Sequence, residues 1–449
     1  MTRAAQLCQD HGVFMSEFAV FRVVLLSLAV LSGAALAVEP GTLLPQVTVP
    51  GGAENDFLGF AVAISPPDDQ GGRFAAVGTV DRFVAVSNEW RPGNPDTPNL
   101  VLAQRLTSPV GFDNWGLAVA IRRQPGDQVF VGAPGHDSSF LNSGRAYVYQ
   151  RGPLGVFLFS VAIDPPNASN VGNFGTVLAI TPDGQLLLIG EPRAQRNDAE
   201  VGAVHVYNLA TSPPTLTLTL FGTAGFGGLG GRFGQSLAVD NQRLTVGAPL
   251  EDDAIGTIDT GAVHVYRREG NVYVAETGPL YASDRLTGDR LGLSVSIAGD
   301  RLLAGAANDD KPAGVDAGGA YAFERSLGGT WQEVQKLRSG QPQLQERYAQ
   351  SVLVTGEHAY IGAYCVNASG CSGPGALYQY RRNAGSWELV QRHSPADGGS
   401  FGFTTATDGA STVLVGSYTA FGNATNSGAV YLLRQNEVLL ADGFEGAPR

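Results

Sequence analysis

The sequence predicts an all-β protein: a seven-bladed β-propeller whose blades are four-stranded antiparallel sheets. Three observations support this prediction. A set of short phrases recurs in the same order along the chain, and successive copies of the first phrase are separated by 57, 59, 59, 58, 57 and 53 residues. Small residues alternate with aromatic or β-branched residues inside each phrase, as in strands, and no stretch shows sustained helical spacing. Gly makes up 60 of the 449 residues, which is far too many for a helical protein.

The first phrase places an aromatic or apolar residue before a glycine and then continues as an alternating strand. A glycine inside a strand permits close backbone approach or a bulge, which suits the crowded inner blades of a radial fold. We expect the residue before it to fill space between adjacent blades. The seven copies begin at Leu58-Gly59, Trp115-Gly116, Phe174-Gly175, Phe233-Gly234, Leu291-Gly292, Tyr348-Ala349 and Phe401-Gly402.

Two further phrases follow the first in each unit. The second is a short apolar run around a glycine, and its glycines are Gly78, Gly132, Gly190, Gly247, Gly305, Gly362 and Gly416. The third begins with a glycine and ends in aromatic or β-branched residues, and it starts at Gly144, Gly202, Gly261, Gly319, Gly375 and Gly428. The first unit has only the looser run Arg82-Phe83-Val84-Ala85-Val86 in this place. Each phrase predicts one strand.

A fourth, weaker apolar run closes several units. These runs cover residues 100–103, 156–159, 216–220, 271–274, 331–337 and 387–390. Four strands in a unit of this length match a propeller blade better than a solenoid coil, because solenoid repeats are generally shorter. Seven blades lie within the usual range for propellers.

The three phrases together resemble the FG-GAP repeats of the integrin α-subunit propeller, and more closely their secreted bacterial relatives. The resemblance extends from about Asn55 to Leu433. It implies a seven-bladed propeller that binds proteins or glycans outside the cell or takes part in adhesion. Calcium-binding members of the family carry a run such as Asp-x-Asp-x-Asp-Gly between the first and second phrases.

Closure of the ring has two candidates. Residues 42–49 precede the first unit as a fourth strand should, and they could pair with the last blade beside residues 428–433. Residues 437–441 compete for the same place. The sequence leaves this choice open.

Composition excludes several classes of protein. The apolar fraction of 43% excludes a disordered chain, and the glycine content excludes a coiled coil. The 41 acidic residues outnumber the 29 basic ones, for a formal charge of −12, which is the wrong sign for binding phosphate backbones or anionic lipid. We therefore expect no nucleic-acid partner.

The N-terminus has the layout of a secretory signal peptide. Arg22 precedes the apolar stretch 23–30, and the small-residue ending Ala35-Leu36-Ala37 follows. An uncleaved anchor is the alternative, but the run is interrupted and short for a membrane span. We expect residues 1–37 to be removed, residues 38–441 to form one propeller, and residues 442–449 to be a flexible tail. Such a chain would be secreted or extracytoplasmic, with no membrane span, and a monomer.

Cys365 and Cys371 are the cysteines outside the signal segment. Their spacing closes a small loop in an oxidising compartment, which predicts a disulfide. A metal pair is the alternative, but it lacks nearby His or further Cys.

The loops between the first and second phrases offer little to a metal ion. Most of them carry one carboxylate in a stretch short enough to be a hairpin turn, which needs no metal. Asp68 and Asp69 form the one adjacent pair, and they are weak candidates for calcium. We expect no other cofactor.

The loops between the second and third phrases are more acidic, and they project from the same face as the blade-to-blade connections. This acidic face is the candidate binding site. A solvated surface that keeps a secreted protein soluble is one interpretation. Capture of a cationic partner or a weakly held calcium ion is the other. The residues concerned are Glu251, Asp252, Asp253, Asp259, Asp284, Asp289, Asp309, Asp310 and Asp316.

Enzyme motifs are poor in this sequence. There is no His-Glu-x-x-His, no Gly-x-Ser-x-Gly elbow and no phosphate-binding loop of the Walker type. His205 and His264 occupy the same strand position in two repeats, which indicates a structural role. The sequence predicts a binding or adhesion module without catalysis, whose partner is an extracellular protein or glycan. The alternatives are an enzyme with a non-repeated site over the axial opening and a purely structural surface protein.

Overall fold

The structure of the chain is a computed structural model. It describes residues 43, 46–48, 53–80, 82–91, 100–111, 113–123, 126–223, 230–310, 316–340, 345–365, 374–396, 399–420 and 426–434. Every regular element within these ranges is a strand. The expected signal peptide (residues 1–37) and C-terminal tail (residues 442–449) lie outside the described residues. The described part has no helix long and apolar enough to cross a membrane.

Each predicted unit forms one blade, and there are seven blades. Blade 1 contains β1 (Ala61–Ile64), β2 (Ala75–Gly78), β3 (Val84–Ser87) and β4 (Leu102–Leu106). Blade 2 contains β5 (Ala118–Arg122), β6 (Gln128–Ala133), β7 (Arg145–Arg151) and β8 (Phe157–Ile163). Blade 3 contains β9 (Val177–Ile180), β10 (Leu186–Glu191), β13 (Ala203–Asn208) and β14 (Thr215–Phe221). Blade 4 contains β15 (Ser236–Val239), β16 (Arg243–Ala248), β17 (Ala262–Glu269) and β18 (Val272–Ala275).

The remaining blades follow the same plan. Blade 5 contains β19 (Ser294–Ala298), β20 (Arg301–Ala306), β21 (Gly319–Arg325) and β22 (Trp331–Leu337). Blade 6 contains β23 (Tyr348–Thr355), β24 (His358–Ala363), β25 (Ala376–Asn383) and β26 (Ser386–His393). Blade 7 contains β27 (Thr404–Thr407), β28 (Thr412–Ser417) and β29 (Ala429–Arg434). A small hairpin, β11 (Gln195–Arg196) with β12 (Ala199–Glu200), rises from blade 3 and was not predicted.

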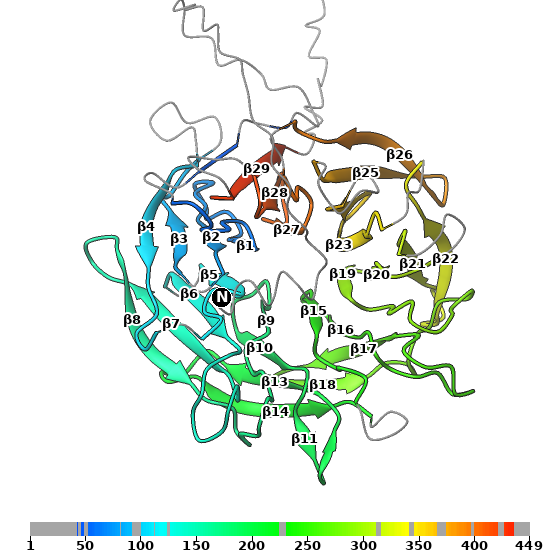
Figure 1. Ribbon diagram of the computed structural model, residues 1–449, viewed down its shortest axis with the longest axis horizontal. Helices are drawn as coiled ribbons and strands as arrows, with labels where there is room; N and C mark the ends of the chain where they lie inside the picture. The colour runs from blue at the N-terminus through cyan, green and yellow to red at the C-terminus, as the bar shows by residue number, and fades with distance from the viewer. Residues whose placement is uncertain are drawn as a thin grey trace, which may run out of the picture.

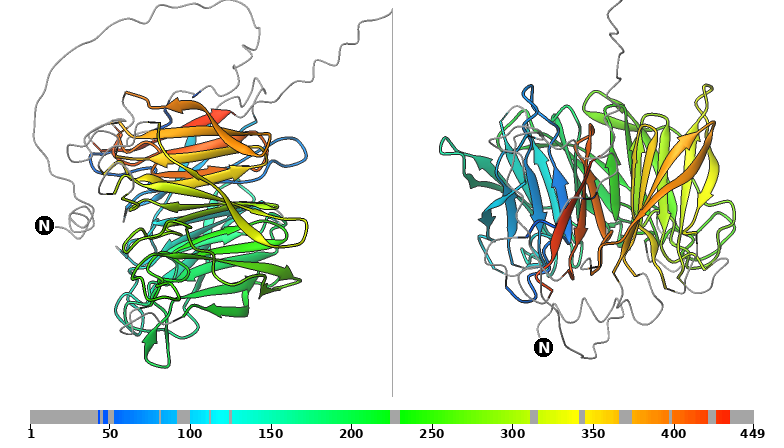
Figure 2. Two further views of the ribbon diagram at one scale, coloured as in Figure 1. Left: turned by 90° about the vertical axis from the view of Figure 1, so that its right-hand side faces the viewer. Right: turned by 90° about the horizontal axis from the view of Figure 1, so that it is seen from above.

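The strands of each blade are antiparallel and follow one another outward from the axis. The first strand of every blade lies innermost, and the fourth lies at the rim (Figure 1). Side views show the strands running between two loop-bearing faces (Figure 2). We call the face with the second-to-third loops and the blade-to-blade connections the upper face. The face with the first-to-second and third-to-fourth turns is the lower face.

The N-terminal segment supplies the strand that closes the ring. Leu43 and Val47 form antiparallel bridges with Leu433 and Val430 of β29. The Val47 amide donates to the Val430 carbonyl at 2.7 Å, and the Val430 amide donates back at 3.1 Å. The first of the two candidate segments therefore lies beside β29, whereas residues 437–441 lie outside the described residues.

A repeated backbone contact joins each blade to the next. The second-phrase glycine of one blade faces the carbonyl oxygen of the first-phrase Gly or Ala of the following blade, so closely that an added Cβ would overlap that oxygen. Seven such pairs complete the circle, so close approach, which the sequence predicted for the first-phrase glycines, is also the role of the second-phrase glycines. The pairs are Gly78–Gly116, Gly132–Gly175, Gly190–Gly234, Gly247–Gly292, Gly305–Ala349, Gly362–Gly402 and Gly416–Gly59.

The residue before each first-phrase glycine is buried at the junction between blades. All seven of these side chains are at most 1% exposed. Phe174 shows the arrangement: its backbone bridges Gly144 of the preceding blade, while its ring lies 5.3 Å from His205 of its own blade. The space-filling role predicted for these residues is confirmed. In blade 5, the glycine that makes the equivalent backbone bridge is Gly318 and not the expected Gly319.

The glycine contact yields a stability prediction. We expect Gly132→Ala to lower the free energy of unfolding by at least about 3 kcal/mol, because the new methyl group would overlap the Gly175 carbonyl and push two blades apart. Gly278→Ala is the matched control, since nothing lies within 4 Å of a Cβ at that position. Urea unfolding of both variants measures the difference, and equal losses would contradict the close-approach argument.

Candidate functional site

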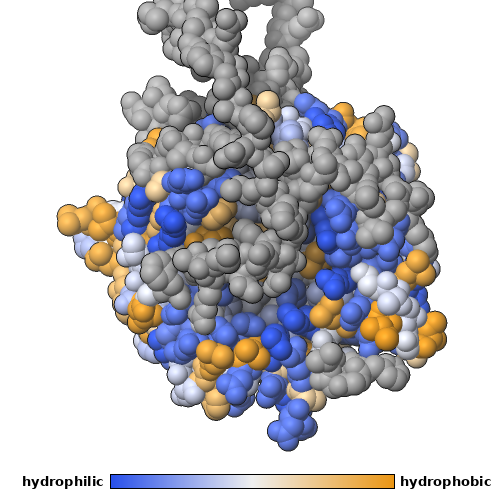
Figure 3. Space-filling model, in the orientation of Figure 1, coloured by the Kyte–Doolittle hydropathy of each residue, from blue (hydrophilic) through white to orange (hydrophobic). Residues whose placement is uncertain are grey.

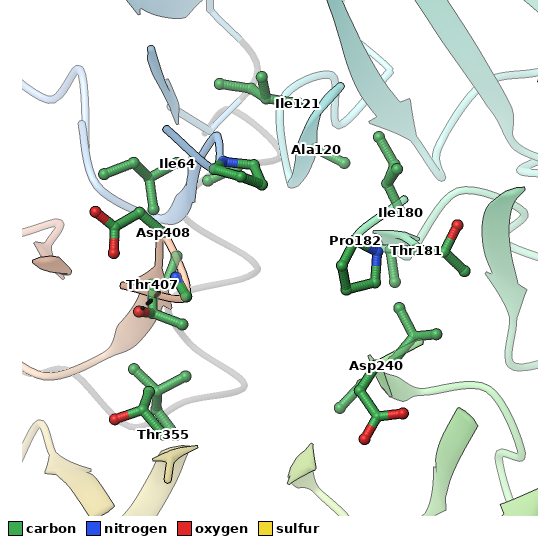
Figure 4. Close-up of a pocket in the computed structure, with 18 of the residues that line it drawn as sticks. Ile64, Ala120, Ile121, Ile180, Thr181, Pro182, Asp240, Thr355, Thr407 and Asp408 are labelled. Atoms are coloured by element: carbon green, nitrogen blue, oxygen red, sulfur yellow. Dashed lines mark hydrogen bonds between the residues drawn. The ribbon is translucent and has the colours of Figure 1, made fainter. Parts of the chain in front are cut away.

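The inner strands enclose an axial cavity of about 1360 Å³. Three successive rings of its wall follow the repeat and are mainly aliphatic. The lowest ring contains Ile64, Ile121, Ile180, Val239, Ile297, Val354 and Thr407. The labelled side chains in Figure 4 come from different blades and surround an open centre. Polar residues line the lower rim of the cavity, among them Asp68, Arg123, Asp240 and Asp408.

A charged network breaks the repeat at the lower rim between blades 1 and 2. Arg123 binds Asp68, and it also donates to Glu89 at 2.9 Å. Arg151 donates to Asp127 at 3.1 Å, while Arg91 donates to Glu89 at 3.1 Å. Three guanidinium groups thus neutralise three carboxylates. Arg123 and Arg151 also cover the ring of Phe74, at 4.7 and 4.6 Å from its centroid. This network ties two blades together.

The expected calcium pair belongs to this network. Asp68 Oδ1 accepts the amides of Gly72 at 2.6 Å and Gln70 at 2.9 Å, and Oδ2 is held by Arg123. Burial raises the pKa of Asp68, but the Gly72 amide and the Arg123 guanidinium outweigh burial and hold the pKa below its ordinary value. Asp69 is exposed beside it. With the oxygens of Asp68 occupied, this arrangement does not fit a calcium site.

Turns of the lower face in blades 4 and 7 are closed by their own carboxylates. Asp408 Oδ1 accepts three successive amides, from Ala410, Ser411 and Thr412. Asp240 accepts the amides of Gln242 and Arg243, each at 2.7 Å. These contacts confirm the interpretation of such residues as turn formers. Across the described residues, no three His, Cys, Asp or Glu side chains are grouped as metal ligands.

On the upper face, the acidic residues of blade 4 hold their own loop in shape. Asp253 is buried; it accepts the amides of Thr257 at 2.8 Å and Ile255 at 3.1 Å and also pairs with Arg285 at 2.8 Å. Burial raises the pKa of Asp253, but these hydrogen bonds outweigh burial and lower it. Asp252 accepts the amide of Asp259 at 2.9 Å.

Glu251 faces inward from the same loop. Its carboxylate lies 2.7 Å from Nε2 of His264, and Glu191 lies 2.8 Å from Nε2 of His205 in blade 3. Both histidines occupy the position predicted from the repeat, and each is paired with a carboxylate inside its blade. This placement confirms their structural role.

Blade 5 gathers three of the candidate carboxylates around one lysine. Lys336 contacts Asp309 and donates to Asp284 at 2.8 Å. The Tyr321 hydroxyl lies 2.7 Å from Asp284 and 3.2 Å from Asp309. Asp289 is buried close by and accepts the Leu286 amide at 2.6 Å. Burial raises the pKa of Asp289 to about 6, and the nearby negative charge of Asp309 adds to the shift.

Asp259 and Asp316 form part of a clamp between blades. Both have a positive φ, and their carbonyls accept the amides of Arg290 and Arg347 in the next blade, each at 3.2 Å. The Asp316 carboxylate also pairs with Arg347 at 3.0 Å and accepts a hydrogen bond from Asn308 at 2.7 Å. Asp310 is exposed and accepts the Asp316 amide at 2.8 Å. These backbone positions favour Asp or Asn, which tolerate the left-handed conformation.

The loops that these carboxylates hold also carry three exposed apolar residues, which were not predicted from the sequence. Ile255, Ile258 and Leu286 are 82%, 54% and 43% exposed. The carboxylates of Asp253 and Asp289 hold the backbone amides of Ile255 and Leu286. Gly288 donates to the carbonyl of Ile258 at 3.2 Å, which joins the two segments. The sequence feature that could have identified them is the presence of large apolar residues inside a polar, glycine-containing loop.

Comparison with known proteins agrees with this architecture. The family model of the FG-GAP repeat matches residues 274–323. That span runs from the end of blade 4 through the first three strands of blade 5, and the same unit recurs in the other six blades. The chain thus contains an FG-GAP repeat, and its seven-bladed architecture fits an integrin α-like FG-GAP propeller. A search of curated proteins found no match.

The fold of this FG-GAP propeller suggests a binding or scaffold module. The matched span contains Asp284, Asp289, Asp309, Asp310 and Asp316. Cys365 is buried after β24 in the same propeller, while Cys371 lies outside the described residues. The disulfide between them stays a prediction.

The raised pKa of Asp289 predicts a pH dependence of stability. Between its ordinary value of 3.8 and about 6, the folded protein keeps a proton that the unfolded chain has released, so the free energy of unfolding falls as pH rises through this window. Asp289→Asn removes the titration, and we expect the variant to be more stable than the parent above pH 6, by at most about 3 kcal/mol. Urea unfolding at several pH values tests this.

Asp69→Asn is the control for that experiment, because Asp69 is exposed on the lower face, away from the Asp289 cluster. It should preserve the slope of stability against pH. An unchanged slope in Asp289→Asn would contradict the assignment of this titration to Asp289.

The disulfide prediction can be tested by mass spectrometry. We expect alkylation of the unfolded, unreduced protein to leave Cys365 and Cys371 unmodified, and alkylation after reduction to label both. Closing so short a loop removes little chain entropy, so reduction should change the stability of the whole propeller only slightly. Labelling without reductant would disprove the pairing.

Proposed function

We propose that this FG-GAP propeller is an exported, non-catalytic binding module that recognises an extracellular protein through its upper face. The observation that carries the proposal is the ordered display of Ile255, Ile258 and Leu286 on loops whose backbones are fixed by buried carboxylates. Exposed apolar side chains are common anchors of protein interfaces. Holding them in place before binding lowers the entropy lost on association.

This proposal gives the acidic residues a supporting role. The carboxylates of Asp253 and Asp289 accept hydrogen bonds from backbone amides, and Asp253 also pairs with Arg285. These two residues therefore position the apolar side chains more than they contact a partner. The apolar character of the loop tips favours a protein over a glycan. FG-GAP repeats are typically extracellular, which agrees with the signal peptide expected at residues 1–37.

Catalysis in the axial cavity has less support. The aliphatic wall follows the repeat, and the charges that break it at Asp68 and Arg123 are paired with one another. A reaction needs an acid, base or nucleophile directed at the substrate, and these groups are directed at their partners instead.

An array of extracellular proteins and glycans tests the proposal, probed with the full chain and with the double variant Ile255→Ser, Ile258→Ser. We expect the parent to bind a protein target and the double variant to bind it at least about tenfold more weakly, as for the loss of an apolar anchor. Leu327→Ser is the control, because Leu327 is fully exposed in a turn of the lower face and should leave binding unchanged.

Two outcomes would contradict the proposal. One is a target whose binding is equally strong in the parent and the double variant. The other is a glycan target, which would place recognition on chemistry other than the apolar tips.

A further inference from the structure

The outer edge of blade 2 carries an uncharged strand. Residues 152–163 read Gly-Pro-Leu-Gly-Val-Phe-Leu-Phe-Ser-Val-Ala-Ile and include all of β8. Other rim strands carry charged residues: Arg105 in β4, Glu333 and Lys336 in β22, Glu388 and Arg392 in β26. The uncharged strand β14 places Thr at alternate positions, and β18 has only four residues. β8 is therefore the longest described rim strand that consists almost wholly of apolar residues.

This edge also exposes several large apolar side chains to solvent. Leu154 is 89% exposed, and Leu158 is 59% exposed. Val156 and Phe159 between and beside them are exposed as well. Hydrophobic residues gather on the blade 2 side of the molecule, at the left of the view (Figure 3). A patch of this kind marks an interaction surface in a protein that has to stay soluble.

The backbone of β8 is open to a further strand. β8 is the last strand of its sheet, in the order β5-β6-β7-β8, and no described strand pairs with its outer edge. Gln104 of β4 holds the amide and carbonyl of Phe157, at 2.8 and 2.7 Å. From Leu158 onward, β8 contains no charge or proline, and no described strand covers its outer edge, although such features usually protect an edge strand from pairing.

We propose that β8 pairs with β8 of a second copy of this chain. Antiparallel pairing about a twofold axis would join the two blades into one eight-stranded sheet that continues from propeller to propeller. The partner follows from charge: each chain carries −12, so two copies repel over most of their surfaces, whereas β8 brings no charge to the contact. A twofold contact must be self-complementary, and a neutral apolar strand with open hydrogen-bonding groups meets that requirement. The sequence alone predicted a monomer, and the exposure of this edge is the reason to depart from it.

Sedimentation velocity of the full chain over a range of concentrations tests the pairing. We expect a monomer–dimer equilibrium in the parent, and at least about tenfold weaker dimerisation in Leu158→Lys, because the twofold axis places two new positive charges on the joined sheet. Leu389→Lys is the control: Leu389 is comparably exposed on rim strand β26, and this substitution should leave dimerisation unchanged. Hydrogen exchange of the β8 amides should slow as the dimer forms.

A parent that stays monomeric at all concentrations would overturn the proposal, and so would open-ended assembly beyond a dimer. A dimer that Leu158→Lys weakens no more than Leu389→Lys does would also overturn it. The result is independent of the upper-face function, since β8 lies at the rim and the Ile255, Ile258 variant leaves it unaltered.

Discussion

The close approach of glycine to a backbone carbonyl across each blade junction is the constraint on which the propeller depends. It brings the inner strands near enough for aromatic side chains such as Phe174 and Phe233 to fill the remaining space, and it repeats until Gly416 meets Gly59. A Cβ at the second-phrase position would separate two blades and also shift the closure of the ring. Ala349 shows that the other partner can carry a methyl group, since this residue adopts a φ of 69° and still directs its carbonyl at Gly305.

The same constraint explains how much of the fold the sequence could predict. Because every junction needs a glycine at a fixed place, the phrases stand out at regular intervals, and strand order follows from phrase order. The choice of closing strand could not be made this way, since residues 42–49 and 437–441 are both largely apolar and each lies near one end of the repeat. Gly318 and Gly319 are adjacent and identical in kind, so only the bridge to Tyr348 distinguishes the one that lies at the junction.

Less of the candidate site could be predicted from the sequence, because the role of a carboxylate depends on which residue contacts it in the folded protein. Asp253 meets Arg285 from the following connection, and Asp309 meets Lys336 from the rim strand of its own blade. These partners are set by radial packing and not by spacing along the chain. These acidic residues lie on loops of the upper face, and many of their carboxylates hold the backbone of those loops. The apolar tips that they display had no repeat to mark them.

Departure from the sevenfold repeat is therefore not by itself a sign of function. The network around Arg123 and Phe74 breaks the repeat strongly, yet each of its charges has a partner and the result is a stronger junction between blades 1 and 2. Ile255 and Ile258 also depart from the repeat, but their neighbours fix the backbone while the side chains remain exposed to water. A side chain whose backbone is held in place but which is exposed to water is available to a binding partner. In this propeller, exposed apolar side chains of this kind lie on the blade 4 loop, as Ile255 does, and at the blade 2 rim, as Leu158 does.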